Sequence, residues 1–357
     1  MINEPITVTT YSNKVITLRQ KNKQMISITH DRPLGDRNTF KMQVSCRLYI
    51  EYDSPADLKE LDFGNMPMPV KHLGSGSNLL FTKDFNGTLL HSRIDFIERL
   101  PGDLFSVGAG MEFDRFCGLA AEEGFWGPEN LSLIPGEVGA AAVQNIGAYG
   151  VEAKDIIKTV HAFDTKSGEF VEFDVSECGY GYRESRFKGA DKDRFVITHA
   201  VFALSRKPAP RLDYSKALGY LKDDPALTPM KVRDAVIAIR KEKLPDPAEI
   251  GSAGSFFKNP VISKEAFGRI VSESDVEVPH YKVTDDLIKV PAAWLIEQCG
   301  WKGKHSGGAA VWEKQPLVIV NASGNATPHD IMELEDKIRS SVSQKFGITL
   351  DCEVEHI

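Results

Sequence analysis

Apolar residues recur at helical spacing in three stretches of the chain. They occupy positions 113–121, 232–239 and 331–338. Gly124 follows the first stretch, and a Thr-Pro pair precedes each of the other two, which suits the end and the start of a helix respectively. Because residues three and four apart share one helix face, the pattern predicts three amphipathic helices.

Other stretches alternate between apolar and polar residues, as half-buried strands do. Residues 159–173 alternate on both sides of a turn at 165–168, and residues 195–204 read as a further strand. A mixed sheet is therefore expected here rather than a helical bundle. Shorter predicted elements are a helix from Ser54 toward Gly64, strands at 70–73, 79–81 and 317–320, and a helix at 292–299.

Two changes of composition mark candidate boundaries. Leu-Pro-Asp-Pro at 244–247 follows the second helix, and we interpret it as a domain boundary. The first folded unit is expected to open near Arg32. Residues 1–30 are predicted to be a disordered extension, since residues 1–24 are polar and a second possible start, Met25, follows them.

The composition is that of a globular protein of about two or three domains, with 42% hydrophobic and 26% charged residues. Its 43 basic and 50 acidic residues give a net charge of −7, so no broad cationic surface is expected for nucleic acid. No stretch approaches the ~20 apolar residues of a membrane helix, and no secretion signal is recognisable. We expect a cytoplasmic protein without a membrane or nucleic-acid partner.

The cysteines and histidines give no basis for a disulfide framework or a metal site. The five cysteines are odd in number, widely spaced and without a C-x-x-C pair, so reduced, mostly buried thiols are expected. The nine histidines form no H-x-H or H-E-x-x-H pattern, and no metal is predicted.

Two glycine-bearing segments are the main candidates for ligand binding. Residues 74–78, Gly-Ser-Gly-Ser-Asn, offer consecutive backbone N–H groups without side-chain obstruction, as a pyrophosphate site requires. The segment is not a Rossmann fingerprint, because that pattern needs a third glycine that opens a helix. A plain hairpin turn explains it equally well.

The second segment, residues 134–150, combines four glycines with a run of alanines. Uncovered backbone of this length normally lies against a large flat group or against a closely packed neighbour. Tight packing of a helix on a sheet is the alternative. Together the two segments favour an extended cofactor with a phosphate portion and a flat ring.

Five motifs together resemble the UDP-N-acetylenolpyruvoylglucosamine reductase family, also called the UDP-N-acetylmuramate dehydrogenases. In chain order they are LGSGSN (73–78), IPGEVGAAAVQNIGAYG (134–150), GYRES (181–185), LPDP (244–247) and GSFFKNP (254–260). The resemblance runs from about residue 32 to the C-terminus and is greatest to the subclass with a mobile tyrosine loop.

The resemblance implies an α+β fold, with an FAD-binding portion of the vanillyl-alcohol-oxidase-like (PCMH-type) kind and a separate α+β substrate-binding domain. FAD-binding subdomain 1 would comprise residues 31–70, completed by 347–357. Subdomain 2 would comprise residues 71–244, and the substrate-binding domain residues 245–346. The proline boundary fits this division. A fold that holds FAD with strand-connecting loops also accounts for the missing Rossmann pattern.

The implied reaction reduces a UDP-sugar, UDP-N-acetylglucosamine enolpyruvate, to UDP-N-acetylmuramate in peptidoglycan precursor synthesis. NADPH would be the co-substrate, and FAD a non-covalent cofactor that passes hydride to the terminal carbon of the enolpyruvyl group. A monomer is expected. The implied cofactor-binding residues are Gly74, Ser75, Gly76, Ser77, Asn78, Pro135, Gly136, Gly139, Gln144, Asn145, Gly147, Ala148, Tyr149 and Gly150.

Three residues carry the implied catalytic roles. Arg183 would hold the substrate carboxylate, Ser255 would protonate C2, and Glu353 would pair with the arginine and stabilise the enol form. Asp351 and Glu355 lie near enough in sequence to compete for the role of Glu353. On the residues alone, the arginine also suits a surface ion pair, the serine a glycine-rich turn, and the glutamate a solvated tail.

Four further residues resemble the family's substrate contacts. Lys243 and Asn259 would bind the diphosphate, Tyr214 would lie in the loop that closes over the substrate, and Tyr182 would line the pocket. Two other functions remain open. One is a flavin oxidase of the same fold, although such enzymes often link flavin through a histidine and neither glycine segment contains one. The other is a non-catalytic nucleotide-sugar binder.

Overall fold

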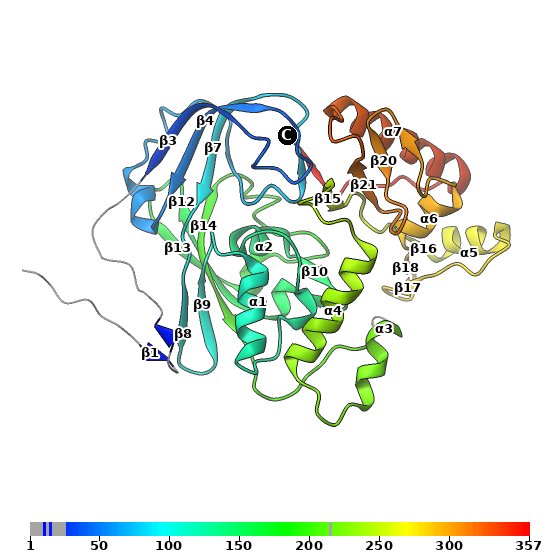
Figure 1. The fold of residues 1–357 in the computed structure, drawn as a ribbon, viewed down its shortest axis with the longest axis horizontal. Coiled ribbons are helices and arrows are strands. Elements are labelled where there is room, and N and C mark those ends of the chain that lie inside the picture. The colour runs from blue at the N-terminus through cyan, green and yellow to red at the C-terminus, as the bar shows by residue number, and fades with distance from the viewer. Residues whose placement is uncertain (1–9, 12–13, 16–25, 214–215) are drawn as a thin grey trace, which may run out of the picture.

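The computed structural model describes residues 10–11, 14–15, 26–213 and 216–357. Two β-sheets, drawn in blue to green in Figure 1, occupy the first part of the chain, and a smaller unit of strands and helices, drawn in yellow to red, lies beside them. The predicted combination of strands and helices is confirmed.

The first sheet has the strand order β3-β4-β7-β5. Both β4 and β5 run parallel to β7, whereas β3 runs antiparallel to β4. A 3-10 helix, η1, follows β4 and is shorter than the predicted helix, since the backbone is already extended at Leu61, before Gly64. The elements are β3 (Ser27–Pro33), β4 (Ser45–Tyr52), η1 (Pro55–Glu60), β5 (Val70–His72) and β7 (Phe85–Ser92).

Two predicted boundaries need correction. Strand β3 starts inside the expected disordered extension 1–30, because its residues pair with β4 from Ser27 onward. The expected boundary after residue 70 falls within β5, and β7 beyond it pairs with β4, so the first piece reaches at least Ser92. The rest of the predicted extension lies outside the described residues, apart from Ile26 and the short strands β1 (Thr10–Tyr11) and β2 (Lys14–Val15).

The second sheet is antiparallel, with the order β13-β12-β14-β9-β8. Helix α2 packs against β14 and β9, and α4 packs against α1, so these helices cover one side of the sheet (Figure 1). The predicted hairpin and the helices at 113–121 and 229–241 are confirmed. The elements are β8 (Ile97–Leu100), β9 (Leu104–Gly108), α1 (Phe113–Glu122), α2 (Val138–Gln144), β12 (Ile157–Asp164), β13 (Phe170–Asp174), β14 (Phe195–Ala203) and α4 (Pro229–Lys243).

The unit after the proline boundary has a four-stranded sheet, β15-β21-β20-β19, and a three-stranded sheet, β16-β18-β17. Helix α7 packs on α6 and on the larger sheet. The predicted strand at 317–320 and the helices at 292–299 and 328–338 are confirmed. The elements are β15 (Gly251–Ser255), β16 (Val261–Ser263), α5 (Lys264–Glu273), β17 (Tyr281–Lys282), β18 (Leu287–Lys289), α6 (Ala292–Gln298), β19 (His305–Ser306), β20 (Ala309–Val311), β21 (Val318–Asn321) and α7 (Pro328–Phe346).

The end of the chain returns to its beginning. Strand β22 (Glu355–His356) pairs in parallel with β6 (Leu79–Leu80), directly after the first glycine segment. One hydrophobic core joins buried residues of the first piece, such as Phe40 and Phe81, to buried residues of the last unit, such as Phe256 and Leu350. This closure places the last residues of the chain next to a candidate cofactor loop.

The remaining described elements are short. All five cysteines are free, and Cys46, Cys117 and Cys178 are buried as expected. No helix in the described ranges is both long enough and apolar enough to cross a membrane. The short elements are η2 (Glu129–Leu131), β10 (Gly147–Ala148), β11 (Val151–Glu152), η3 (Ala153–Asp155), η4 (Val175–Cys178), α3 (Lys216–Gly219) and η5 (Tyr220–Asp223).

Candidate active site

The two predicted glycine segments lie against each other. The Ser77 hydroxyl donates to the carbonyl of Pro135 at 2.9 Å, and the Ser75 hydroxyl donates to Oε1 of Glu137 at 3.1 Å. Gly136, at φ +131°, has no room for a larger side chain without crowding Ser77. Segments about 60 residues apart in sequence thus form one surface, as binding of a single extended ligand requires.

Gly76 has a specific steric reason to be glycine. Its φ is +65°, and a Cβ built on it would lie 2.2 Å from the carbonyl oxygen of Arg37. The Gly76 carbonyl also accepts a hydrogen bond from the backbone N–H of Thr39. The loop 74–78 is therefore pressed onto residues 37–39 and held in one shape.

Part of the second segment is used for internal packing instead. Gly139 lies on α2 where a Cβ would be 3.0 Å from the Cβ of Ala109, so the alternative of tight packing holds at this position. The side chain of Asn145 is buried and bonds to protein groups, donating to Glu152 and to the carbonyl of Gly181 and accepting from Lys154. Asn145 therefore connects the end of α2 to the arginine motif, and only its backbone is left for a ligand.

The rest of the second segment forms a hairpin turn. Gly147 and Ala148 make up β10, which pairs with β11, and Tyr149 and Gly150 form the turn, with φ of +49° and +82°. The Tyr149 carbonyl accepts a hydrogen bond from Asn130. Burial raises the pKa of the Tyr149 phenol above its ordinary value. The Gly147 carbonyl points to the next part of the site.

Arg183 and Glu353 form a short, largely buried ion pair. Nε of Arg183 donates to Oε1 of Glu353 at 2.6 Å, and Nη2 donates to the carbonyl of Gly147 at 2.6 Å. The two side chains are only 15% and 11% exposed. Burial disfavours the charged arginine, but the carboxylate of Glu353 outweighs it and raises the arginine pKa above its ordinary value. Arg183 also has φ +59°, unusual for a residue with a side chain.

Glu353 connects three of the predicted motifs. Its backbone N–H donates to the carbonyl of Phe256 at 2.9 Å, and its carbonyl accepts from Nδ2 of Asn78 at 3.2 Å. Its acidic neighbour Glu355 pairs instead with Lys192 at 2.7 Å and with Lys71 at 3.4 Å. The geometry therefore selects the middle carboxylate of the tail as the partner of the arginine.

Ser255 directly precedes Phe256, whose backbone carbonyl accepts a hydrogen bond from the backbone N–H of Glu353. It is the last residue of β15, and it follows Gly254, whose φ is +70°. Its hydroxyl makes no hydrogen bond within the described ranges of the chain. The neighbouring Phe256 and Phe257 are 0% and 1% exposed, so apolar rings enclose the strand at this point.

Of the four predicted substrate contacts, Asn259 and Tyr182 lie together, whereas Lys243 is at the end of α4. Nδ2 of Asn259 lies 3.4 Å from the hydroxyl of Tyr182, whose ring has the ammonium of Lys289 4.9 Å from its centroid. Burial raises the pKa of the Tyr182 phenol. Lys243 is exposed at the end of α4, and its carbonyl accepts from the indole of Trp312. Tyr214 lies outside the described residues.

Lys188 belongs to the site but was missed at the sequence level. Its ammonium donates to Oε1 of Gln144 at 2.6 Å and to the carbonyl of Arg183 at 3.0 Å. Burial lowers its pKa. Its position five residues after Arg183 could have drawn attention to it, but a lone lysine has no motif. It bridges the second glycine segment and the arginine.

Gln144 provides a test of whether these residues fit a flavin. Its Nε2 is buried and has no hydrogen-bond partner among the residues that the structure describes. A buried amide without a partner is costly unless a ligand accepts from it, and a flavin ring carries carbonyl and nitrogen acceptors along its edge. Together with the glycine loops, this donor fits the proposed cofactor.

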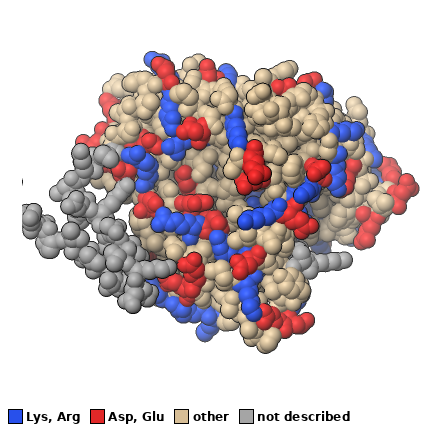
Figure 2. Space-filling model, in the orientation of Figure 1, with Lys and Arg blue, Asp and Glu red and all other residues tan. Residues whose placement is uncertain are grey.

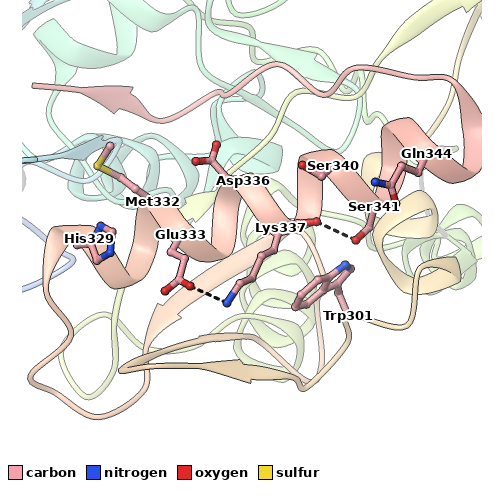
Figure 3. A pocket seen from close by; sticks show the side chains of 9 residues that line it. All are labelled: Trp301, His329, Met332, Glu333, Asp336, Lys337, Ser340, Ser341 and Gln344. Atoms are coloured by element: carbon pink, nitrogen blue, oxygen red, sulfur yellow. Dashed lines mark hydrogen bonds and ion pairs between the residues drawn. The ribbon is translucent and has the colours of Figure 1, made fainter.

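Two other features lie away from these residues. A shallow groove of about 610 Å³ runs along the outside of α7, and Figure 3 shows its lining, which contains none of the predicted site residues. In the described part of the chain, Glu335, Cys352 and His356 bring potential metal-ligand atoms within 4.8 Å of one another, a grouping that sequence spacing did not reveal. Hydrogen bonds from the thiol and the imidazole to Glu335 account for this cluster.

Charge is mixed over the surface. Acidic and basic side chains alternate across the face in Figure 2, with no large area of one sign. This face therefore lacks the broad cationic surface that nucleic-acid binding uses.

Two family models match separate parts of the chain. Residues 62–174 match an FAD binding domain, and residues 246–357 match the C-terminal domain of UDP-N-acetylenolpyruvoylglucosamine reductase. The crystal structure of that reductase from Thermus caldophilus has the same fold, with a TM-score of 0.66 and 22% identity, covering 94% of this chain and 99% of that one. Fold and site thus define an FAD-binding oxidoreductase of the α+β, PCMH-type class.

Relatives specify the family. UDP-N-acetylenolpyruvoylglucosamine reductase from Bacteroides fragilis is 46% identical over 329 residues, which is 91% of this chain and 98% of the relative. The enzymes from Porphyromonas gingivalis and Burkholderia multivorans are 46% and 40% identical, each over 93% of this chain and at least 97% of the relative. The chain belongs to the UDP-N-acetylenolpyruvoylglucosamine reductase family.

Proposed function

We propose that the protein reduces UDP-N-acetylglucosamine enolpyruvate to UDP-N-acetylmuramate with NADPH, as a monomer in the cytoplasm. The observation that carries the proposal is the buried Arg183–Glu353 pair, which is hydrogen-bonded to both glycine segments and to the backbone of Phe256, the residue after Ser255. FAD, when bound without a covalent link, would supply the hydride that reaches the terminal enolpyruvyl carbon.

Arg183 would stabilise the charge that develops on the substrate. Arrival of hydride at the terminal carbon leaves negative charge at C2, which is delocalised into the adjacent carboxylate. A guanidinium matches a carboxylate and stays charged, and Glu353 and the Gly147 carbonyl fix its orientation before substrate binds. Nη1 of Arg183 makes no hydrogen bond within the described residues, so it remains available to the substrate.

Ser255 would donate the proton that C2 requires. Its hydroxyl has no hydrogen-bond partner in the described part of the protein, and the next residue, Phe256, is hydrogen-bonded through its backbone to Glu353. A serine is a weak acid, so this role requires a basic carbanion and a site from which water is excluded, which the buried Phe256 and Phe257 favour. Glu353 would orient the arginine and stabilise the enol form.

The UDP portion would extend toward the last unit. The amide of Asn259 and the exposed ammonium of Lys243 suit phosphate oxygens, and Tyr182 lies beside Asn259. Tyr214 would close over the bound substrate and exclude water. The cofactor would lie on the surface formed by segments 74–78 and 135–150.

A two-step anaerobic experiment tests this function. NADPH should bleach the flavin absorbance of the purified protein, and UDP-N-acetylglucosamine enolpyruvate should restore it with formation of UDP-N-acetylmuramate. Restoration by oxygen alone, or flavin that stays attached after denaturation, would favour an oxidase. A colourless protein that takes up no FAD would favour a nucleotide-sugar binder.

A further inference from the structure

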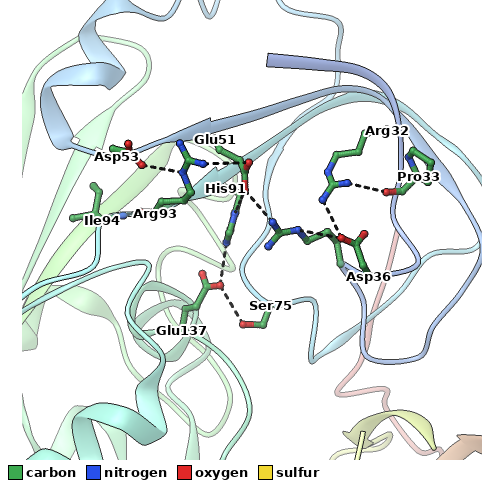
Figure 4. Close-up of polar contacts among 12 residues, drawn as sticks. Arg32, Pro33, Asp36, Glu51, Asp53, Ser75, His91, Arg93, Ile94 and Glu137 are labelled. Carbon is green, nitrogen blue, oxygen red and sulfur yellow. Dashed lines mark hydrogen bonds and ion pairs between the residues drawn. The ribbon is translucent and has the colours of Figure 1, made fainter. Parts of the chain in front are cut away.

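His91 lies between two carboxylates beneath the first glycine segment. It is on β7, where its Nδ1 is 3.1 Å from Oε1 of Glu51 and its Nε2 is 3.1 Å from Oε1 of Glu137 (Figure 4). The same oxygen of Glu137 accepts from the hydroxyl of Ser75 at 3.1 Å. A contact chain therefore runs from the first sheet to the loop 74–78.

The two carboxylates differ in their other partners. Glu51 is neutralised by Arg37, whose Nη2 lies at 3.0 Å, and Arg93 lies 3.6 Å from its second oxygen. Glu137 has no lysine or arginine within ion-pair distance among the described residues, and its side chain is only 12% exposed. Among the described residues, the imidazole of His91 is the one basic side chain within ion-pair distance of Glu137.

His91 has a carboxylate on each side of its ring. Both ring nitrogens face carboxylate oxygens, and only the charged form donates from both. The His91 side chain is 8% exposed, so water does not replace either contact. An unbalanced carboxylate at Glu137 would lie directly against Gly74, where a Cβ would be 3.3 Å from its Oε2.

We propose that His91 is a positioning residue for the cofactor: it balances the charge of Glu137 beneath loop 74–78, and so permits that loop to hold a dinucleotide diphosphate. This inference rests on the proposed function, which places the FAD diphosphate at this loop. The balance matters because the diphosphate is itself anionic, and a second negative charge a few ångströms away would oppose binding.

Variants that remove the basic group, the acidic group or both test the proposal. The quantity to measure is FAD affinity, from the flavin fluorescence when FAD is added back to the apoprotein. His91→Leu should weaken FAD binding about tenfold or more, because Glu137 then lacks its basic partner beside the loop. Glu137→Gln alone should bind FAD as tightly as wild type or more tightly. The double variant His91→Leu/Glu137→Gln should recover to within about threefold of wild type.

Two outcomes would overturn the inference. One is unchanged FAD affinity in His91→Leu, and the other is a double variant as weak as His91→Leu alone, which would show that histidine acts by packing. If His91→Leu does not fold, the pair Glu137→Gln and His91→Leu/Glu137→Gln still decides, since the proposal requires nearly equal affinities for these two. A wild-type apoprotein that takes up no FAD would instead contradict the proposed function.

Discussion

Two pairs, each of a basic side chain and a carboxylate, contact the same glycine loop and differ in which of their donor atoms remain without a partner. Glu353 meets the loop at Asn78 and pairs with Arg183, 170 residues away in sequence. Glu137 meets it at Ser75 and contacts His91, 46 residues away. Among the described residues, the first pair leaves Nη1 of the arginine without a hydrogen bond, whereas both nitrogens of the histidine face carboxylate oxygens.

This difference suits the first pair to contact the substrate and the second pair to hold the loop in position. A pair that keeps donors in reserve can act on a ligand, whereas a pair whose donors are all used can only hold its surroundings in place. Similar burial therefore does not imply a similar role, since all four side chains are 15% exposed or less. Perturbing each pair should affect different steps of the reaction.

The largest expected effect is at Ser255. Ser255→Ala should slow reoxidation of the reduced flavin by the enolpyruvyl substrate about 10²–10⁴-fold, because the proton donor is lost. Reduction by NADPH should stay near the wild-type rate. Stopped-flow absorbance resolves the two half-reactions, and Ser252→Ala on the same strand is the control. An equal loss in both half-reactions would remove the assigned role.

A smaller effect is expected at the arginine. Arg183→Gln should slow the second half-reaction about 10²–10³-fold, as removal of one preorganised donor to a developing anion does. The matched control is Arg186→Gln. Arg186 lies three residues after Arg183, but it pairs with Asp191 and its guanidinium lies over the ring of Phe173. If both variants lose the same amount in single-turnover assays, the pair with Glu353 has no special role.

Gly76 tests the loop that both pairs share. Gly76→Ala should lower the free energy of unfolding by about 1–2 kcal/mol through its left-handed backbone, and the clash with the Arg37 carbonyl should weaken FAD binding further. Gly168→Ala is the matched control, since its φ is +73° and nothing lies within 4 Å of its Cβ position. Urea unfolding and FAD titration of both variants separate strain from contact, and equal FAD affinities would argue against a binding role for the loop.

The smallest effect is expected at the His356–Glu335 pair, which serves as a reference because, among the described residues, neither side chain contacts a glycine segment. A hydrogen bond to Glu335 raises the pKa of His356 above its ordinary 6.5. Burial opposes the Glu335 carboxylate, but the bonds from His356 and Cys352 outweigh it and hold that pKa below its ordinary 4.5. His356→Gln should cost about 1 kcal/mol or less of stability and leave both half-reactions unchanged.

The sign of its pH dependence follows from the two directions. The contribution of His356 is complete below pH 6.5 and fades as the pH rises through its raised pKa, whereas that of Glu335 is complete above pH 4.5 and fades as the pH falls. The difference in melting temperature between wild type and His356→Gln should therefore be greatest between pH 4.5 and 6.5. A flat difference from pH 4 to 9 would contradict this assignment.

The regular elements were predictable because local rules govern them. Helix α7 begins after the predicted Thr327 cap, whose hydroxyl accepts from Asp330, and α4 begins after Thr228 in the same way. Apolar spacing alone then fixed which faces are buried. The start of β3 was not predicted, because its largely polar sequence has no strand pattern of its own. The strand is held by its pairing with β4.

The site was predictable only where a motif carried it. Arg183 and Glu353 came from resemblance, since no local pattern links residues so far apart. Resemblance assigned Asn145 to the cofactor, but its side chain instead donates hydrogen bonds to Glu152 and to the carbonyl of Gly181. His91 could not be found at all: a lone histidine in a buried strand becomes significant only when the fold brings a helix start to its side.

The pairing of β22 with β6 has a consequence for synthesis of the protein. The proposed catalytic carboxylate reaches its arginine only after the tail has threaded back beside the first glycine loop. Both glycine segments would thus be synthesised well before the residue that completes the proposed catalytic pair. The protein could act on a substrate only after its last residues had been made and had paired with β6.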